Sequence, residues 1–398
     1  MDTHKELMRK MNKRGNASRT RDWSKLCPDV LRKILETLNP LASNRAKTVC
    51  SDWYSVWKTC LRPPCNSLHI IHQGDSSRLF DPEEDKICTR KLVGRSNRRY
   101  CMASFENWLL MVDSRLEFHI FNLLTCKRIN LPSMSSHLDG WGIIFDNDDD
   151  LECSDLCGYL VEPCGKKIYV SKDVLEWQSS AVLWINEKTG DYFVAWTFRH
   201  AYLFSYKKGD EMWLNLSNSR KGSRFLDMAY RNSKLYLLTT DHRINVFYLS
   251  RDCNDNNENP NLNQRFQFDE QQWNNSLKKK IAIQESGEVL IILSLKGKIM
   301  FYVFKMNFES SNWERVESIG DHEMLIFGHG VTVKAPVEDV GYGVKSGSIC
   351  FVDDDVWPDH DHRGSNCGVF NIATSEIEWH RKPCFYINES QWFVPWFA

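Results

Sequence analysis

A group of acidic residues and histidines near the C-terminus is the strongest candidate for chemistry in this sequence. Asp353–Asp355 (DDD) is followed closely by Asp359–Arg363 (DHDHR). Carboxylates and imidazoles at such close spacing could hold a divalent metal ion. A solvated polar loop between two strands explains the same residues without a metal, and we favour that interpretation. The sequence therefore predicts no metal site and no cofactor.

The other motifs that could carry catalysis are incomplete. His322-Glu323 is followed by Met-Leu-Ile, so the H-E-x-x-H zinc motif lacks its last histidine. The glycines between 341 and 347 do not have the dinucleotide-binding spacing, and neither a G-x-S-x-G elbow nor a phosphate-binding P-loop is present. The cysteines between 153 and 164 do not form the paired C-x2-C sets of a structural zinc site. We predict no catalytic residue.

Charge and hydropathy limit the classes of partner. The chain has 398 residues and a net charge of −1, which gives no general attraction to nucleic acid or to anionic membranes. The first 21 residues are basic, which fits a disordered, solvated tail, a nuclear-import signal or a nucleic-acid contact. No apolar run approaches 18 residues and no signal-peptide core follows Met1. We therefore expect a protein of the cytoplasm, the nucleus or both, whose 14 cysteines are reduced thiols.

Two amphipathic helical patterns lie near the N-terminus. Pro28 and Asp29 suit a helix start, and Asn39-Pro40 ends the first pattern. Its apolar stripe consists of Leu31, Ile34, Leu35 and Leu38. A second stripe consists of Ala46, Val49, Cys50, Trp53 and Trp57. A unit this small is near the lower limit for independent folding. We therefore expect another chain, or the rest of this chain, to cover the apolar side chains that the unit cannot bury by itself.

A more specific motif runs through the same segment. It comprises Trp23-Ser24-x-Leu26, Asp29-x-Leu31, Ile34-Leu35, Leu38 and Arg45-Ala46-Lys47-x-Val49-Cys50-x-x-Trp53. These residues resemble the F-box of large plant F-box protein families. The resemblance implies a three-helix hook that docks on a Skp-type adaptor and, through it, joins a cullin-based ubiquitin ligase.

The resemblance also implies which residues meet the adaptor. The corresponding positions are Leu26, Leu31, Ile34, Leu35, Leu38, Val49, Cys50 and Trp53. One position departs from the family pattern, which usually has Leu-Pro where this chain has Leu26-Cys27, with Pro28 one position late. We expect any impairment of the hook to arise at Cys27.

The chain beyond residue 66 has the pattern of a mainly β domain. Five first strands are predicted at Trp108–Val112, Tyr192–Trp196, Leu235–Leu238, Val289–Leu293 and Ile349–Val352. Each has a second strand, at Phe118–Phe121, Tyr202–Tyr206, Ile244–Leu249, Met300–Phe304 and Gly368–Ile372. The recurrence of about 40–50 residues indicates a β-propeller of six or seven blades. The interval between the second strands at Phe118–Phe121 and Tyr202–Tyr206 is about twice this recurrence, so it leaves room for one further unit, at Ile143–Phe145 or Lys167–Val170. A pair of β-sandwiches remains an alternative fold.

Phrases in this region add to the resemblance. FNLLTCKRINLPS (121–133), LDMAYRNSKLYLLTT (226–240) and GVFNIATSEIEW (368–379) are similar to the C-terminal half of one plant F-box family, a kelch- or propeller-like domain of unknown function.

The predicted organisation is a basic tail (1–21), an F-box (22–62) and a propeller-like domain (66–398) that recognises substrate. The predicted function is that of a non-catalytic substrate receptor of a Skp–cullin–F-box (SCF) ubiquitin ligase, which binds a target protein for degradation. Two alternatives remain: a metal-dependent or other enzymatic propeller, and an interaction scaffold with a non-functional F-box remnant. Because specificity in a propeller lies in its variable loops, the substrate cannot be read from the sequence.

Overall fold

The computed structural model forms two compact units, Met1–Pro63 (unit 1) and Pro64–Ala398 (unit 2), and each is described by itself. The described residues are 23–38, 40–60, 68–73, 76–81, 86–88, 99–113, 115–134, 138, 140–145, 157–171, 174–175, 178–217, 224–249, 270–295, 300–307, 312–320, 322–328, 331–334, 345–352, 367–379 and 390–393. The basic tail and the acidic and histidine-rich group at 353–363 lie outside them.

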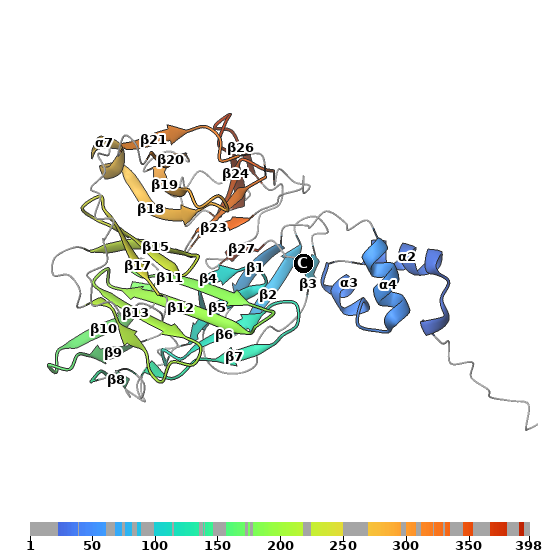
Figure 1. Cartoon of the computed structure of the whole chain (residues 1–398), viewed down its shortest axis with the longest axis horizontal. Coiled ribbons are helices and arrows are strands. Elements are labelled where there is room, and N and C mark those ends of the chain that lie inside the picture. Colours follow the sequence, from blue (N-terminus) through green and yellow to red (C-terminus); the bar gives the residue numbers. More distant parts are fainter. Residues whose placement is uncertain are drawn as a thin grey trace, which may run out of the picture. The chain divides into compact units, whose positions relative to one another are not determined.

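Unit 1 is helical (Figure 1). Its elements are the 3-10 helix η1 (Trp23–Lys25) and the α-helices α2 (Pro28–Thr37), α3 (Pro40–Ala46) and α4 (Ser51–Thr59). The prediction of one helical stripe from Ala46 to Trp57 is wrong, because a turn separates α3 from α4. In that turn the Thr48 hydroxyl donates to the Arg45 carbonyl at 2.8 Å, and Cys50 has an extended backbone.

Short helices form a small core in unit 1. Its buried members are Leu31, Leu35, Ala46, Trp53 and Val56. Two indole groups tie the helices together through hydrogen bonds: Trp53 Nε1 donates to the backbone carbonyl of Trp23 at 3.0 Å, and Trp57 Nε1 donates to Ser43 Oγ at 3.0 Å. The apolar stripe of α2 is thus largely covered by α3 and α4 of the same unit.

In its described residues, unit 2 is built of β-sheets and also contains the short helix α7 (Glu270–Asn274). The first four sheets along the chain consist of β1 (Leu68–Gln73), β2 (Ser76–Asp81), β3 (Lys86–Cys88) and β27 (Ser390–Phe393); β4 (Arg99–Phe105), β5 (Trp108–Asp113), β6 (Phe118–Asn122) and β7 (Arg128–Asn130); β8 (Gly142–Phe145), β9 (Cys157–Val161) and β10 (Lys167–Ser171); and β11 (Ser180–Asn186), β12 (Asp191–Phe198), β13 (Tyr202–Lys207) and β14 (Leu214–Asn215).

The remaining three sheets follow in the same chain order. They consist of β15 (Phe225–Arg231), β16 (Lys234–Thr239) and β17 (Ile244–Tyr248); β18 (Ser276–Ile283), β19 (Val289–Leu295), β20 (Phe301–Asn307) and β21 (Asn312–Val316); and β22 (Met324–Phe327), β23 (Val331–Lys334), β24 (Ser348–Val352), β25 (Cys367–Asn371) and β26 (Ile377–Trp379).

All five predicted strand pairs are confirmed. They correspond to β5–β6, β12–β13, β16–β17, β19–β20 and β24–β25, and in each pair the two strands are antiparallel neighbours. In the first four of these sheets, one more strand precedes the predicted pair and is antiparallel to its first strand. These preceding strands are β4, β11, β15 and β18, which pair with β5, β12, β16 and β19. In the last sheet the strand beside β24 is β22, which runs parallel to it and pairs antiparallel with β23.

The inner strands show how the sheets form a ring. Strand β4 contacts β11, β11 contacts β15, β15 contacts β18, and β18 contacts β23. The sheet of β8, β9 and β10 is skipped in this series, although it lies between β7 and β11 in the sequence. Both segments proposed as the intervening unit, Ile143–Phe145 and Lys167–Val170, belong to this one sheet. Six sheets therefore act as blades, and β8–β10 lies outside them (Figure 1).

The two ends of the β domain meet in one sheet. Strand β27 pairs with β1, with Leu68 opposite Phe393 and Ile71 opposite Ser390. Strand β27 also contacts β24 of the last blade. Because the last strand of the chain completes the first blade, the ring is closed by backbone hydrogen bonds.

Aromatic side chains fill the space between neighbouring blades. The Phe118 ring centroid lies 5.0 Å from that of Trp196 and 5.5 Å from that of Trp213, and both pairs are tilted. All three side chains are fully buried. Tilted aromatic pairs of this kind stabilise a core beyond the area they bury.

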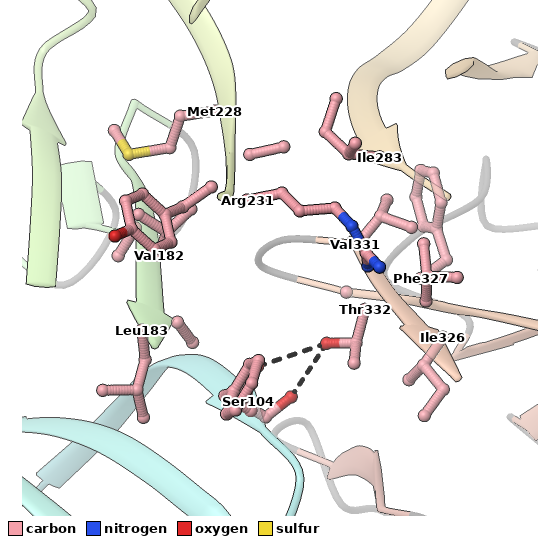
Figure 2. A pocket seen from close by; sticks show the side chains of 17 residues that line it. Ser104, Val182, Leu183, Met228, Arg231, Ile283, Ile326, Phe327, Val331 and Thr332 are labelled. Atoms are coloured by element: carbon pink, nitrogen blue, oxygen red, sulfur yellow. Dashed lines mark hydrogen bonds between the residues drawn. The ribbon is translucent and has the colours of Figure 1, made fainter. Parts of the chain in front are cut away.

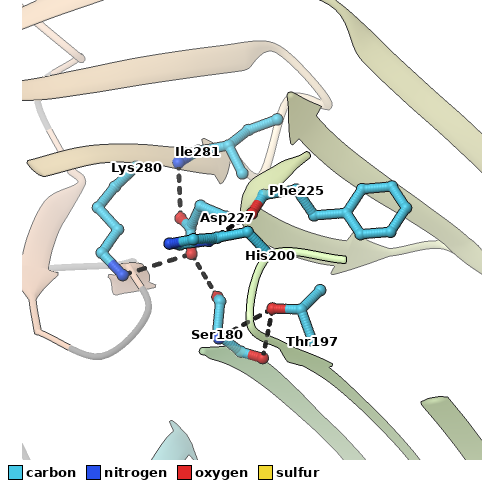
Figure 3. Close-up of polar contacts among 7 residues, drawn as sticks. All are labelled: Ser180, Thr197, His200, Phe225, Asp227, Lys280 and Ile281. Carbon is cyan, nitrogen blue, oxygen red and sulfur yellow. Dashed lines mark hydrogen bonds and ion pairs between the residues drawn. The ribbon is translucent and has the colours of Figure 1, made fainter. Parts of the chain in front are cut away.

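A buried polar group joins three inner strands (Figure 3). Asp227 of β15 accepts hydrogen bonds from Ser180 Oγ of β11 at 2.5 Å and from the Ile281 amide of β18 at 2.8 Å. Lys280 Nζ lies 3.4 Å from Asp227 Oδ1. Burial raises the pKa of Asp227, while Lys280 and these hydrogen bonds act in the opposite direction. The group fixes the register of three neighbouring blades.

Gly368 in β25 allows a close approach of Phe351. A Cβ atom at this position would lie 2.6 Å from Phe351 Cζ, and the Phe351 side chain is fully buried. We therefore expect Gly368→Ala to destabilise unit 2 by about 1–3 kcal/mol, as overpacking of a core does. Urea unfolding monitored by fluorescence measures this change. Gly142→Ala is the matched control, because its Cβ would make an ordinary 3.7 Å contact with Val161; equal effects would contradict the prediction.

Candidate functional site

Unit 1 carries a set of large apolar side chains on its surface. Their exposed fractions lie between 43% and 56%, and they are Trp23, Val30, Val49 and Tyr54. Single exposed apolar residues are common, but four on so small a helical unit indicate a surface that another protein covers.

Lysines and aromatic rings extend this surface along α4. The Tyr54 and Trp57 rings are nearly parallel, with centroids 6.3 Å apart. Lys58 Nζ lies 4.5 Å from the Tyr54 ring centroid, and Lys47 Nζ lies 4.7 Å from that of Trp57. These cation–π contacts hold the rings in place and give the surface a basic edge.

The residues predicted to meet an adaptor fall into three groups. Leu31 and Leu35 are 1% exposed and Trp53 is 8% exposed, so they lie in the core of unit 1. Four residues are partly buried and pack against that core: Leu26, Ile34, Leu38 and Cys50. Val49 is 54% exposed. The three core residues are positioned to support the surface, whereas Val49 can touch a partner directly.

Sequence reasoning missed three residues of this surface as contact candidates. Val30 and Tyr54 lie outside the apolar stripes that periodicity selects, and Trp23 was recognised as part of the motif without a contact role. A signal was present for Tyr54, because Trp57 follows it at i+3 and places a second aromatic ring on the same helix face.

Cys27, the departure from the family pattern, stands at the entrance to α2. It is exposed, has an extended backbone and makes no side-chain capping bond. Its carbonyl accepts a hydrogen bond from the Leu31 amide at 3.0 Å, and Pro28 takes the first helical position. A proline there is favourable, because the first turn has no partner for its amide. The helix thus begins normally despite the missing Leu-Pro pair.

The remaining described residues bear on metal binding, cysteine chemistry and membrane insertion. Among the described residues, no group of three or more His, Cys, Asp or Glu side chains is placed to hold a metal ion. Cys101 and Cys350, in the core of unit 2, are thiols that form no disulfide. Burial, followed by the charge of Glu36, raises the pKa of the Cys60 thiol. In the part of the chain that the structure describes, no helix has the length and apolar character needed to cross a membrane.

Comparison with known proteins assigns both units to described domains. Residues 23–63 match the F-box domain, and residues 79–371 match the KIB1-4 beta-propeller. Three relatives from Arabidopsis thaliana align with this chain over most or nearly all of its length. They are the F-box protein At2g04810 (54% identity, 99% of each chain), F-box only protein 7 (49% identity, 96% of each chain) and F-box protein KIB4 (32% identity, 77% of each chain).

Proposed function

Because the chain belongs to the KIB1-4 family of F-box proteins, we propose that it is the substrate-recognition subunit of an SCF-type ubiquitin ligase. Unit 1 docks on a Skp-type adaptor and, through it, on a cullin. Unit 2 binds a protein that is then ubiquitinated and degraded. The protein acts in the cytoplasm, the nucleus or both.

The apolar surface of unit 1 is the observation that carries this proposal. Its exposed members Val49, Val30 and Trp23 would form direct contacts with the adaptor, with Leu26, Ile34, Leu38 and Cys50 at its edge. Leu31, Leu35 and Trp53 would act by holding the helices in position. Apolar and aromatic side chains at the centre of an interface supply most of its binding free energy.

The chain's contribution to the reaction is proximity. Ubiquitin transfer needs an activated ubiquitin and a substrate lysine to meet, and the recruited conjugating enzyme carries the former. A receptor that holds both partners raises the effective concentration of the reacting groups without taking part in bond formation.

Assembly with the adaptor is the direct test. We expect the full-length chain, expressed with a Skp-type adaptor and a cullin, to co-purify with both proteins. Proteins that accumulate when the gene is removed, and that bind the full chain, are its substrates. Failure of the wild-type chain to bind any Skp-type adaptor would overturn the receptor proposal and favour a scaffold with an F-box remnant.

A further inference from the structure

Unit 2 contains a pocket where the inner strands of its blades converge. The lining residues come from β4, β11, β15, β18, β22 and β23, or directly follow β22. Its cavity volume is about 110 Å³. Because strands of five blades contribute, the pocket exists only once the ring has formed.

Most residues that line the pocket have apolar side chains, while polar atoms contribute nearly half of its accessible surface. The apolar residues Val182, Met228, Ile283, Phe327 and Val331 line it from four different blades (Figure 2). An apolar cavity of about 150 Å³ is large enough for benzene. At about 110 Å³ this pocket is smaller, so it suits a short aliphatic group or part of a single ring.

Arg231 is the one charged residue among the described residues that line the pocket. Its side chain extends from the end of β15 across the pocket, and its guanidinium lies beside Val331 (Figure 2). Nη2 donates a hydrogen bond to the backbone carbonyl of Glu285 at 3.0 Å, which fixes the orientation of the group. Nε is buried and has no acceptor among the described residues, and no described carboxylate lies within ion-pair distance.

An uncompensated guanidinium in such surroundings favours an anionic ligand. Arginine stays protonated at any physiological pH, so the site cannot relieve the charge by losing a proton. Arg231 is half-buried, so water screens its charge less than it would on an open surface, and an anion that pairs with it gains accordingly. The guanidinium offers parallel N–H donors that match the two oxygens of a carboxylate.

A pair of hydroxyl groups closes the other side of the pocket. Ser104 Oγ of β4 and Thr332 Oγ1 of β23 lie 3.2 Å apart, and Thr332 Oγ1 also donates to the Ser104 carbonyl at 3.3 Å. These hydrogen bonds hold β23 against β4. Val331, which lies beside the Arg231 guanidinium (Figure 2), is thereby fixed in place, and this preorganises the pocket.

We propose that this pocket binds a carboxylate carried on a short apolar stem, with Arg231 donating hydrogen bonds to the carboxylate and the apolar walls enclosing the stem. A phosphate fits less well, because a dianion would bring a second negative charge into apolar surroundings. The carboxylate comes either from a small free acid or from an acidic residue of a bound protein. The proposal concerns unit 2 and does not depend on adaptor docking.

Ligand-observed NMR with the full-length chain tests the proposal. The probes are benzoate, its uncharged analogue benzamide, and the blocked peptides Ac-Ala-Leu-Glu-Ala-NH2 and Ac-Ala-Leu-Gln-Ala-NH2. We expect benzoate or the Glu peptide to bind at least about tenfold more tightly than its uncharged counterpart, as a charge-assisted bidentate contact implies. Arg231→Gln should weaken that binding about tenfold or more, whereas Arg115→Gln, an exposed arginine outside the pocket, should leave it unchanged.

A second variant separates pocket binding from loss of fold. Val331→Phe fills the cavity while keeping Arg231, and it should also abolish binding; thermal unfolding identifies variants that fold. Binding of benzoate alone supports a free acid as the ligand, and binding of the Glu peptide alone supports a protein-borne carboxylate. If neither probe binds the wild-type chain, or if binding survives both Arg231→Gln and Val331→Phe, the proposal is wrong, whatever the outcome of adaptor binding.

Discussion

Val49→Asp abolishes co-purification of the full chain with a Skp-type adaptor, as we expect from the exposure of Val49 in the turn before α4. Loss of the apolar contact removes roughly 1.5–3 kcal/mol. Placing a carboxylate in a desolvated interface adds a further penalty. Together these effects correspond to a reduction in affinity of about 100-fold or more. Co-expression followed by affinity purification, and calorimetry with purified adaptor, measure the change.

The choice of Val49 avoids an ambiguity that affects core positions. A substitution such as Leu31→Asp would place a charge in the core of unit 1, so a loss of binding could reflect unfolding. Val49 is 54% exposed, and the helices do not depend on its side chain for packing. Leu214→Asp is the matched control, since Leu214 is 49% exposed on unit 2. Equal adaptor binding by the Val49→Asp and Leu214→Asp chains would contradict the proposed docking surface.

Asp227→Ala should destabilise unit 2 by about 3–5 kcal/mol, because it leaves the Lys280 ammonium buried without its counter-ion. Asp227 is fully buried, and the Lys280 side chain is 10% exposed. The Ser180 hydroxyl and the Ile281 amide would lose their acceptor as well. Urea unfolding of the full chain, monitored by tryptophan fluorescence, measures the change.

Two comparisons test the explanation for Asp227. Asp191→Ala removes the exposed Asp191–Lys208 ion pair, which spans 3.8 Å, and should change stability by about 1 kcal/mol or less. The double variant Asp227→Leu/Lys280→Met replaces both buried charges with apolar groups and should recover much of the lost stability. If Asp227→Ala costs no more than Asp191→Ala, Asp227 does not stabilise the contact between the blades.

Much of the fold was predictable because the predicted strands are locally apolar. The segments Val289–Leu295 and Ser348–Val352 are almost continuously hydrophobic and could be recognised without knowing their neighbours. The inner strand Ser276–Ile283 contains three consecutive lysines, so its sequence argues against a buried strand. Lys280 becomes tolerable there only because Asp227, 53 residues earlier, lies beside it.

The surface of unit 1 was likewise predictable in part from the sequence, while the rest depends on tertiary packing. Periodicity correctly placed Leu31 and Leu35 on one helix face, but it could not tell a face that meets a partner from one that meets its own unit. The motif resemblance assigned both residues to the adaptor, and the structure places both in the core. Val30 and Tyr54 are exposed because the other faces of their helices, with Leu31 and Leu35 in α2 and Trp53 and Val56 in α4, form the core.

The F-box, the β character of the large unit and five of its strand pairs could be predicted from the sequence, since these depend on residues close together in the chain. Long-range packing places β8–β10 outside the ring, pairs β27 with β1 to close it, and brings Arg231 to a pocket formed by five blades. These features join residues up to hundreds of positions apart. Local patterns of hydrophobicity hold no information about which distant strands will meet, because that choice is made by packing of the whole ring.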